Sequence, residues 1–211
     1  ILDHYTRLMP EKKQGDMDGV KSVLSQLIRN NIFADEDQID LAKGCYIINL
    51  GKFDKDGIMA KAIVYFVTSK LNNIYEELPP QATNAERVEL RHFTVIDEAH
   101  YMLGFKNKPL QNLIAVGRNK GMSVILATQN MDSFKSKHFD FYANAQYPLI
   151  MKQQQQNDGV LKDLFGVSGI ALQELKHAIA GLQKGELITK DNKAIALGLG
   201  KHWKKIKVTR F

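Results

Sequence analysis

The residues best suited to chemistry are two adjacent acids at the end of an apolar run. Asp97 and Glu98 directly follow Phe93-Thr94-Val95-Ile96. Hydrolysis of a nucleoside triphosphate needs one carboxylate to hold Mg²⁺ or its water, and a second to orient the attacking water. A strand would fix the backbone while the following turn points the two side chains in different directions. The spacing fits a Walker B element, although acids are also favourable where a helix begins, and that interpretation stays open.

Two further polar residues flank the next apolar run, residues 122–127. Gln129 follows the run, so its amide would lie beside the carboxylates if the two strands are neighbours. There it could hydrogen-bond the attacking water or the γ-phosphate. Arg118 precedes the same run and would lie at the opposite end of the sheet, where it could reach a neighbouring subunit's nucleotide as an arginine finger does. A surface amide and a solvated turn arginine are the plainer alternatives.

The elements that position these residues alternate along the chain. Apolar residues at helical spacing predict a helix capped by Asp16 or Asp18 that ends near Asn30, and further helices at 58–78, 109–116, 158–165 and 170–180. Short apolar runs predict buried strands at 45–50, 93–96 and 122–127, another short strand at 147–151, and a terminal hairpin with arms 185–189 and 194–199. This order predicts an α/β fold with a largely parallel sheet flanked by helices, whose ligands lie at the carboxyl ends of the strands.

Composition excludes several classes of protein. The 211 residues are 44% hydrophobic and carry a net charge of +6, from 29 Lys+Arg against 23 Asp+Glu. Disordered and collagen-like chains are excluded. The single Cys45 excludes a disulfide framework and a cysteine-based zinc site, which favours a reducing, cytoplasmic setting. No apolar stretch approaches the roughly 20 residues of a membrane span, so we expect no membrane contact.

Basic residues gather at the C-terminal end. They predict either a solvated tail or edge strand, or a contact with the nucleic-acid backbone. The five candidates for DNA binding are Lys201, Lys204, Lys205, Lys207 and Arg210.

Three segments together carry a resemblance to a known family: Val95-Ile96-Asp97-Glu98-Ala99-His100, Gly117-Arg118-Asn119-Lys120-Gly121 and Ala127-Thr128-Gln129. They resemble the second half of a HerA/FtsK-type ATPase, including the VirB4 and TraC branch. The segment Leu182-Gln183-Lys184-Gly185-Glu186-Leu187 is similar to the strand that closes those domains. More narrowly, the chain resembles the C-terminal part of the large HerA-like ATPase of phosphorothioation-dependent DNA restriction systems, DptH or DndH.

The resemblance covers most of the chain from about Cys45 onward, leaving 1–44 as a helical segment and 45–211 as the ATPase core. It implies a RecA-like fold, ATP and Mg²⁺ as cofactors, and a hexameric ring that moves DNA or protein through its pore, with other restriction-system subunits as partners. It also implies that Asp97 is the magnesium-side acid, Glu98 the catalytic base, Gln129 the sensor and Arg118 the arginine before the sensor strand.

One required motif is absent from these 211 residues. A P-loop needs Gly-x-x-x-x-Gly-Lys-Ser/Thr to cradle phosphates, and the Gly-Lys pairs at Gly51 and Gly200 are followed by Phe53 and His202. Because the first residue is Ile1, we expect the P-loop upstream in a longer chain, and no ATP hydrolysis by these residues alone. Two alternatives remain: a non-catalytic RecA-like module that binds DNA or a partner ATPase, and a fragment of a DEAH-type helicase.

Overall fold

The structure is a computed structural model that describes residues 1–30, 39–81 and 89–208. The chain divides into two compact units. One unit comprises Ile1–Val95 and Asn107–Ile125, and the other comprises Ile96–Lys106 and Leu126–Phe211. The strands β1 (His92–Ile96) and β2 (Met122–Leu126) belong to the first unit except for their last residues, which are grouped with the second unit, as are the residues that follow each strand.

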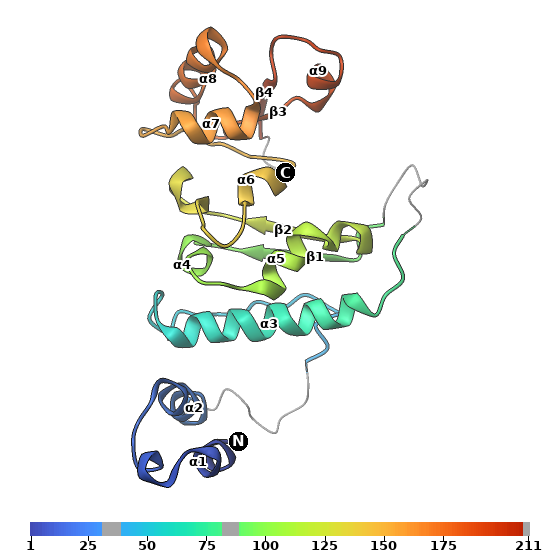
Figure 1. Cartoon of the computed structure of the whole chain (residues 1–211). Coiled ribbons are helices and arrows are strands. Elements are labelled where there is room, and N and C mark those ends of the chain that lie inside the picture. Colours follow the sequence, from blue (N-terminus) through green and yellow to red (C-terminus); the bar gives the residue numbers. More distant parts are fainter. Residues whose placement is uncertain (31–38, 82–88, 209–211) are drawn as a thin grey trace. The chain divides into compact units, whose positions relative to one another are not determined.

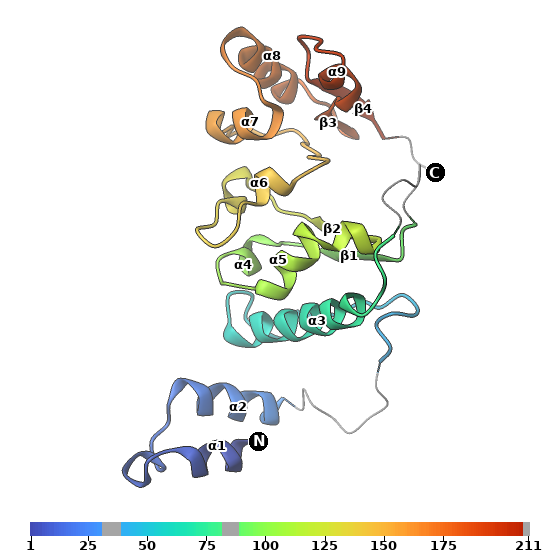
Figure 2. The same cartoon turned by 45° about the vertical axis from the view of Figure 1, so that its right-hand side comes forward.

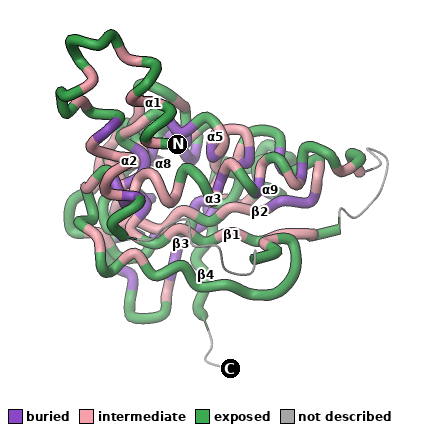
Figure 3. Tube along the Cα trace, turned by 90° about the horizontal axis from the view of Figure 1, so that it is seen from below, coloured by how far each residue is buried: buried purple, intermediate pink, exposed green. Residues whose placement is uncertain are grey.

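The N-terminal segment contains α1 (Leu2–Leu8), η1 (Glu11–Lys13) and α2 (Gly19–Arg29). Asp18 caps α2, because its Oδ1 accepts the Lys21 backbone N–H at 2.8 Å, and the Tyr5 hydroxyl donates to the other oxygen of the same carboxylate at 2.8 Å. The predicted start and end of this helix are confirmed. By contrast, α1 has no buried residue and is drawn in green and pink in Figure 3.

Two helices pack against one face of the strand pair in the first unit: α3 (Ile58–Glu76) and α5 (Lys108–Ala115). Their shared core contains Leu71 and Tyr75 from α3, Leu113 from α5 and Met122 from β2. Figure 1 shows α3 and α5 beside the two strands. Both helices begin where the apolar spacing predicts.

The strands β1 and β2 form a two-stranded parallel pair, which confirms the mixed α/β prediction. The prediction that the 93–96 strand is buried on both faces is wrong. Phe93 is 50% and Val95 58% exposed, while their neighbours along β1 are half-buried. This alternation is typical of a strand with one covered face, and α3 and α5 cover only one.

The predicted strand at 45–50 is also wrong. These residues form no strand, and Ile47 is 93% exposed. An apolar run becomes a strand only where an edge is available to bond its backbone, and no strand in the described ranges pairs with this segment. Near the end of the run, the Asn49 side-chain oxygen accepts the Gly51 N–H at 2.8 Å, which favours a turn there.

The second unit is built around a separate apolar core. The predicted helices at 158–165 and 170–180 are confirmed as α7 (Asp158–Phe165) and α8 (Gly169–Ala180). The remaining elements are α4 (His100–Leu103), η3 (Met131–Phe134), α6 (Phe141–Asn144), β3 (Glu186–Lys190), α9 (Asn192–Ala196) and β4 (Trp203–Lys207). The core includes Val160, Leu161, Phe165, Leu175, Ile179 and Ile188.

The terminal hairpin exists with a different second arm. β3 pairs with β4 (Figure 2). The pairing is antiparallel, with Ile188 opposite Lys205. The predicted arm at 194–199 is wrong, because Asp191 accepts the Ala194 N–H at 3.1 Å and caps the short helix α9 instead of closing a two-residue turn. The predicted strand at 147–151 is reduced to a single antiparallel bridge between Ile150 and Ile188.

Within the described ranges, no helix combines the length and the apolar character needed to cross a bilayer.

Candidate functional site

The carboxyl ends of β1 and β2 are joined through one residue. The Ala127 N–H donates to Ile96 at 2.9 Å, and the Ala127 carbonyl accepts the Ala99 N–H at 2.8 Å. The two residues between Ile96 and Ala99 are therefore held as a short turn at the strand end. These residues are Asp97 and Glu98, the acids that the sequence singled out.

Glu98 has a backbone conformation that side chains rarely adopt. Its φ is +49°, and it is the one non-glycine residue with positive φ among the residues that the structure describes. Such a conformation costs on the order of 1–3 kcal/mol and persists where the surroundings impose it. Here the surroundings are the Ala127 bonds on either side and the Asp97 carboxylate, whose Oδ1 accepts the Glu98 N–H at 2.9 Å.

The structure brings Glu98 and Gln129 together. Gln129 Nε2 donates to Glu98 Oε1 at 2.5 Å, across 31 residues of sequence. This contact follows from the parallel pairing of β1 and β2, because the polar residue after each strand emerges at the same edge. A carboxylate held by a neutral amide in this way can accept a proton from a bound molecule once the amide turns to another partner.

His100 belongs to the same cluster, although the sequence analysis assigned it no role of its own. Its Nδ1 lies 3.3 Å from Glu98 Oε2 and 3.3 Å from the hydroxyl oxygen of Thr128. The imidazole also packs on the ring of Tyr101, with centroids 4.0 Å apart. The local sequence carries no signal for these contacts, because they depend on the turn at 97–99, whose shape is set by hydrogen bonds to Ala127 on the other strand.

Asp97 is exposed at the sheet edge. One of its oxygens accepts the Glu98 N–H and the other remains available. Oxygen donors are the ligands that Mg²⁺ prefers, and Mg²⁺ commonly keeps several waters while bound by one or two carboxylates, so this donor set fits Mg²⁺ held through water. No cluster of three or more His, Cys, Asp or Glu side chains that could form a protein-only metal cage occurs in ranges 1–30, 39–81 and 89–208.

Arg118 belongs to the first unit, whereas the residues of this cluster belong to the second. It lies in η2 (Gly117–Lys120), immediately before β2, whereas Gln129 follows the far end of that strand. The side chain is exposed, and its guanidinium makes no ion pair or hydrogen bond within the described part of the chain. The neighbouring Lys120 is used structurally, because its ammonium donates to the Glu76 and Leu78 carbonyls at the end of α3.

The C-terminal lysines lie on and beside β4, which is exposed at every residue except Trp203. Two of them have partners: Lys201 lies over the Trp203 ring, 4.2 Å from its centroid, and Lys205 Nζ is 3.0 Å from Glu186. Lys204 and Lys207 are exposed on the same strand. Arg210 lies outside the described residues.

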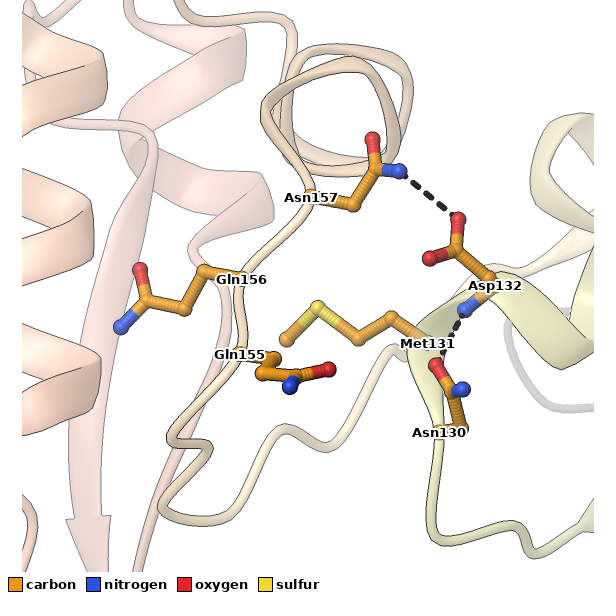
Figure 4. Close-up of a pocket in the computed structure, with 6 residues that line it drawn as sticks. All are labelled: Asn130, Met131, Asp132, Gln155, Gln156 and Asn157. Carbon is orange, nitrogen blue, oxygen red and sulfur yellow. Dashed lines mark hydrogen bonds between the residues drawn. The ribbon is translucent and has the colours of Figure 1, made fainter.

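A polar pocket begins at the residue after Gln129 (Figure 4). It encloses about 180 Å³ between two segments, Asn130–Asp132 and Gln155–Asn157. The Asn157 side chain points at Asp132 and donates to its carboxylate at 2.7 Å, and Asn130 caps η3 by accepting the Asp132 N–H at 2.9 Å. Sequence reasoning did not anticipate this pocket, because its two walls are joined only by tertiary folding.

The class of site is thus a pair of acids and an amide at the carboxyl ends of two parallel strands in a mixed α/β chain. No family model matches the chain, and no curated protein matches it. Among solved structures, the chain is similar to VirB4 of Thermoanaerobacter pseudethanolicus, with 19% sequence identity and a TM-score of 0.49. The match covers 72% of this chain, which spans 38% of the VirB4 chain.

Proposed function

We propose that these residues form the catalytic-carboxylate half of an ATP-hydrolysing motor of the HerA/FtsK kind. The observation that carries the proposal is the hydrogen bond between Gln129 and Glu98 at the shared edge of β1 and β2. It joins a candidate base to a candidate sensor of the γ-phosphate, the pair that hydrolysis of a nucleoside triphosphate requires.

Each residue has a distinct role in this proposal. Asp97 would hold Mg²⁺ through water, and the ion, when bound, would neutralise charge that develops on the phosphates. Gln129 turns from Glu98 to the γ-phosphate, which frees Glu98 Oε1 to accept a proton from the attacking water. The phosphate cradle comes from polypeptide outside these 211 residues, since they contain no P-loop motif.

Motor function adds a ring and a polymer to this chemistry. Arg118 serves a neighbouring subunit's nucleotide in the proposed hexamer, because it lies at the opposite end of β2 from Gln129 and its guanidinium is exposed. The polymer is DNA, and Lys204 and Lys207 on β4 contact its backbone. On the sequence resemblance, the motor works in the cytoplasm within a DNA restriction system.

The test is ATP hydrolysis by the intact protein, with and without duplex DNA, for wild type and Glu98→Gln. Loss of a general base typically lowers turnover by 10²-fold or more, so we expect DNA-stimulated turnover that collapses in the variant. Glu174→Gln is the matched control, because Glu174 is exposed on α8 and carries the same change of charge. Equal turnover in wild type and Glu98→Gln would refute the catalytic assignment.

A non-catalytic module that binds DNA or a partner ATPase is the second candidate, and the missing P-loop favours it. Such a module needs the fold but not the Glu98 carboxylate. DNA binding that is unchanged in Glu98→Gln, together with absent ATP turnover in wild type, would make this the better assignment.

A further inference from the structure

We propose that His100 is the positioning residue of Glu98: its Nδ1–H holds the second carboxylate oxygen and fixes the direction in which the base faces. This inference rests on the proposed function, because it concerns how the candidate base is prepared for the reaction. It is carried by three contacts within one unit, those of Glu98 with Gln129 and His100 and that of His100 with Thr128.

The need for a positioning group is visible at Glu98 Oε2. This oxygen is buried and makes no hydrogen bond within the part of the chain that the structure describes. A buried carboxylate oxygen without a donor is costly. His100 Nδ1, at 3.3 Å, is in position to supply the donor. The separation is longer than the roughly 2.7–2.9 Å of a charge-assisted bond, and catalytic hydrogen bonds commonly tighten when the substrate binds.

The carboxylate also determines which imidazole nitrogen carries the proton. If Nδ1 were bare, its lone pair would face the negative oxygen of Glu98 and repel it. With a proton on Nδ1, the same geometry becomes attractive. The Thr128 hydroxyl oxygen also lies 3.3 Å from Nδ1 and accepts the Asn130 N–H at 3.4 Å. Because a hydroxyl can both accept and donate, Thr128 is compatible with a proton on Nδ1 without selecting it.

The cluster therefore holds Glu98 in a resting arrangement. Oε1 accepts a hydrogen bond from Gln129, and Oε2 is buried beside His100. When Gln129 turns to a phosphate, Oε1 is released, while Oε2 stays beside His100 Nδ1 at 3.3 Å. The base is then exposed through one oxygen in a fixed direction.

Substitutions at His100 distinguish a donor at the Nδ1 position from general support of the fold. Asn places an amide nitrogen on Cγ, where His carries Nδ1, whereas Gln places its amide nitrogen one atom further out, nearer to Nε2. In the intact protein we expect His100→Ala and His100→Gln to lower kcat about ten- to hundredfold with little change in KM for ATP. His100→Asn should retain kcat within about threefold of wild type. Equal loss in the Asn and Gln variants, or no loss in any, would overturn the inference.

A second readout requires no turnover. NMR of the nucleotide-free intact protein, labelled with ¹⁵N at histidine, shows which imidazole nitrogen carries a proton, and the His100 signal is assigned by its loss in His100→Asn. We expect a proton on Nδ1 in wild type, and a bare Nδ1 in Glu98→Ala. A bare Nδ1 in wild type would overturn the inference by itself.

The two proposals fail separately. If Glu98→Gln leaves turnover unchanged, the proposed catalytic role is wrong, and the NMR result still reports whether His100 holds Glu98. If Glu98→Gln abolishes turnover while the His100 variants behave like wild type, only the positioning role is wrong.

Discussion

Replacing Gly121 with alanine should destabilise the first unit, because the backbone there is in the left-handed region and is closely approached. Its φ is +77°, and an added Cβ would lie 2.2 Å from the Glu89 carbonyl oxygen and 2.5 Å from Gln81 Nε2. Those two groups would have to move. They belong to residues joined by two hydrogen bonds of 2.6 Å, one in each direction between Gln81 and Glu89.

The loss in the free energy of unfolding can be estimated from the backbone strain and the hydrogen bonds that would be broken. An alanine in the left-handed region costs roughly 1–2 kcal/mol, and each hydrogen bond lost costs roughly 0.5–1.5 kcal/mol, with the lower values applying to exposed bonds such as these. We therefore expect Gly121→Ala to lower the free energy of unfolding by about 2–3 kcal/mol. Urea denaturation followed by circular dichroism measures this as a lower midpoint with an unchanged slope.

Gly104→Ala is the matched control. Gly104 has a φ of −73° and no atom within 4 Å of the position of an added Cβ. Alanine at such a site is neutral or stabilises by up to about 1 kcal/mol, by restricting the unfolded chain. If Gly121→Ala unfolds at the same midpoint as wild type, the reasoning from φ and the close contacts is wrong.

Two further predictions concern the hairpin of β3 and β4. The backbone N–H of Gln183, and then the Lys205 ammonium, hold the pKa of Glu186 below its ordinary value of 4.5. The stability that the Glu186 charge provides is therefore present above pH 4.5 and is lost as pH falls through the lower pKa of the folded state. Urea midpoints of Glu186→Gln and wild type should differ at pH 7 and converge in acid, and a difference that stays constant with pH would contradict this. If DNA contacts β4, the double substitution of Lys204 and Lys207 by Gln should weaken duplex binding and reduce the slope of log K against log[salt] by about 1.8, whereas the same change at two N-terminal lysines, 12 and 13, should leave the slope unaltered.

The helices were predictable from the sequence because their signals are local. Asp18 as a cap, Pro109 in the first turn and the spacing of apolar residues in α7 and α8 each operate within a few residues. The strands were less predictable, because a strand needs a partner that lies elsewhere in the chain. Residues 45–50 have the composition of a buried strand but pair with no strand in the described ranges. Residues 194–199 do not form the second arm of the hairpin, because the cap at Asp191 begins a short helix there.

The site residues also divide into those with a local sequence signal and those whose contacts depend on distant parts of the chain. Asp97, Glu98 and Gln129 could be chosen because each directly follows an apolar run, and parallel pairing then brings the Glu98 and Gln129 side chains to one edge. His100 could not be chosen, because its contact with Glu98 depends on a turn whose shape is set by hydrogen bonds to Ala127 on the other strand. That information is absent from the local sequence.

The conformation of Glu98 links these observations to the chemistry. With a φ of +49°, the residue does not follow the direction of β1, and its carboxylate reaches Gln129 and His100. An aspartate or glutamate that only started α4 would gain from the helix dipole without leaving the favourable backbone region. The helix-start alternative therefore does not account for the strain, or for the contact with Gln129. A strained turn that directs a carboxylate onto an amide and an imidazole is the arrangement that the proposed role of Glu98 as a base would use.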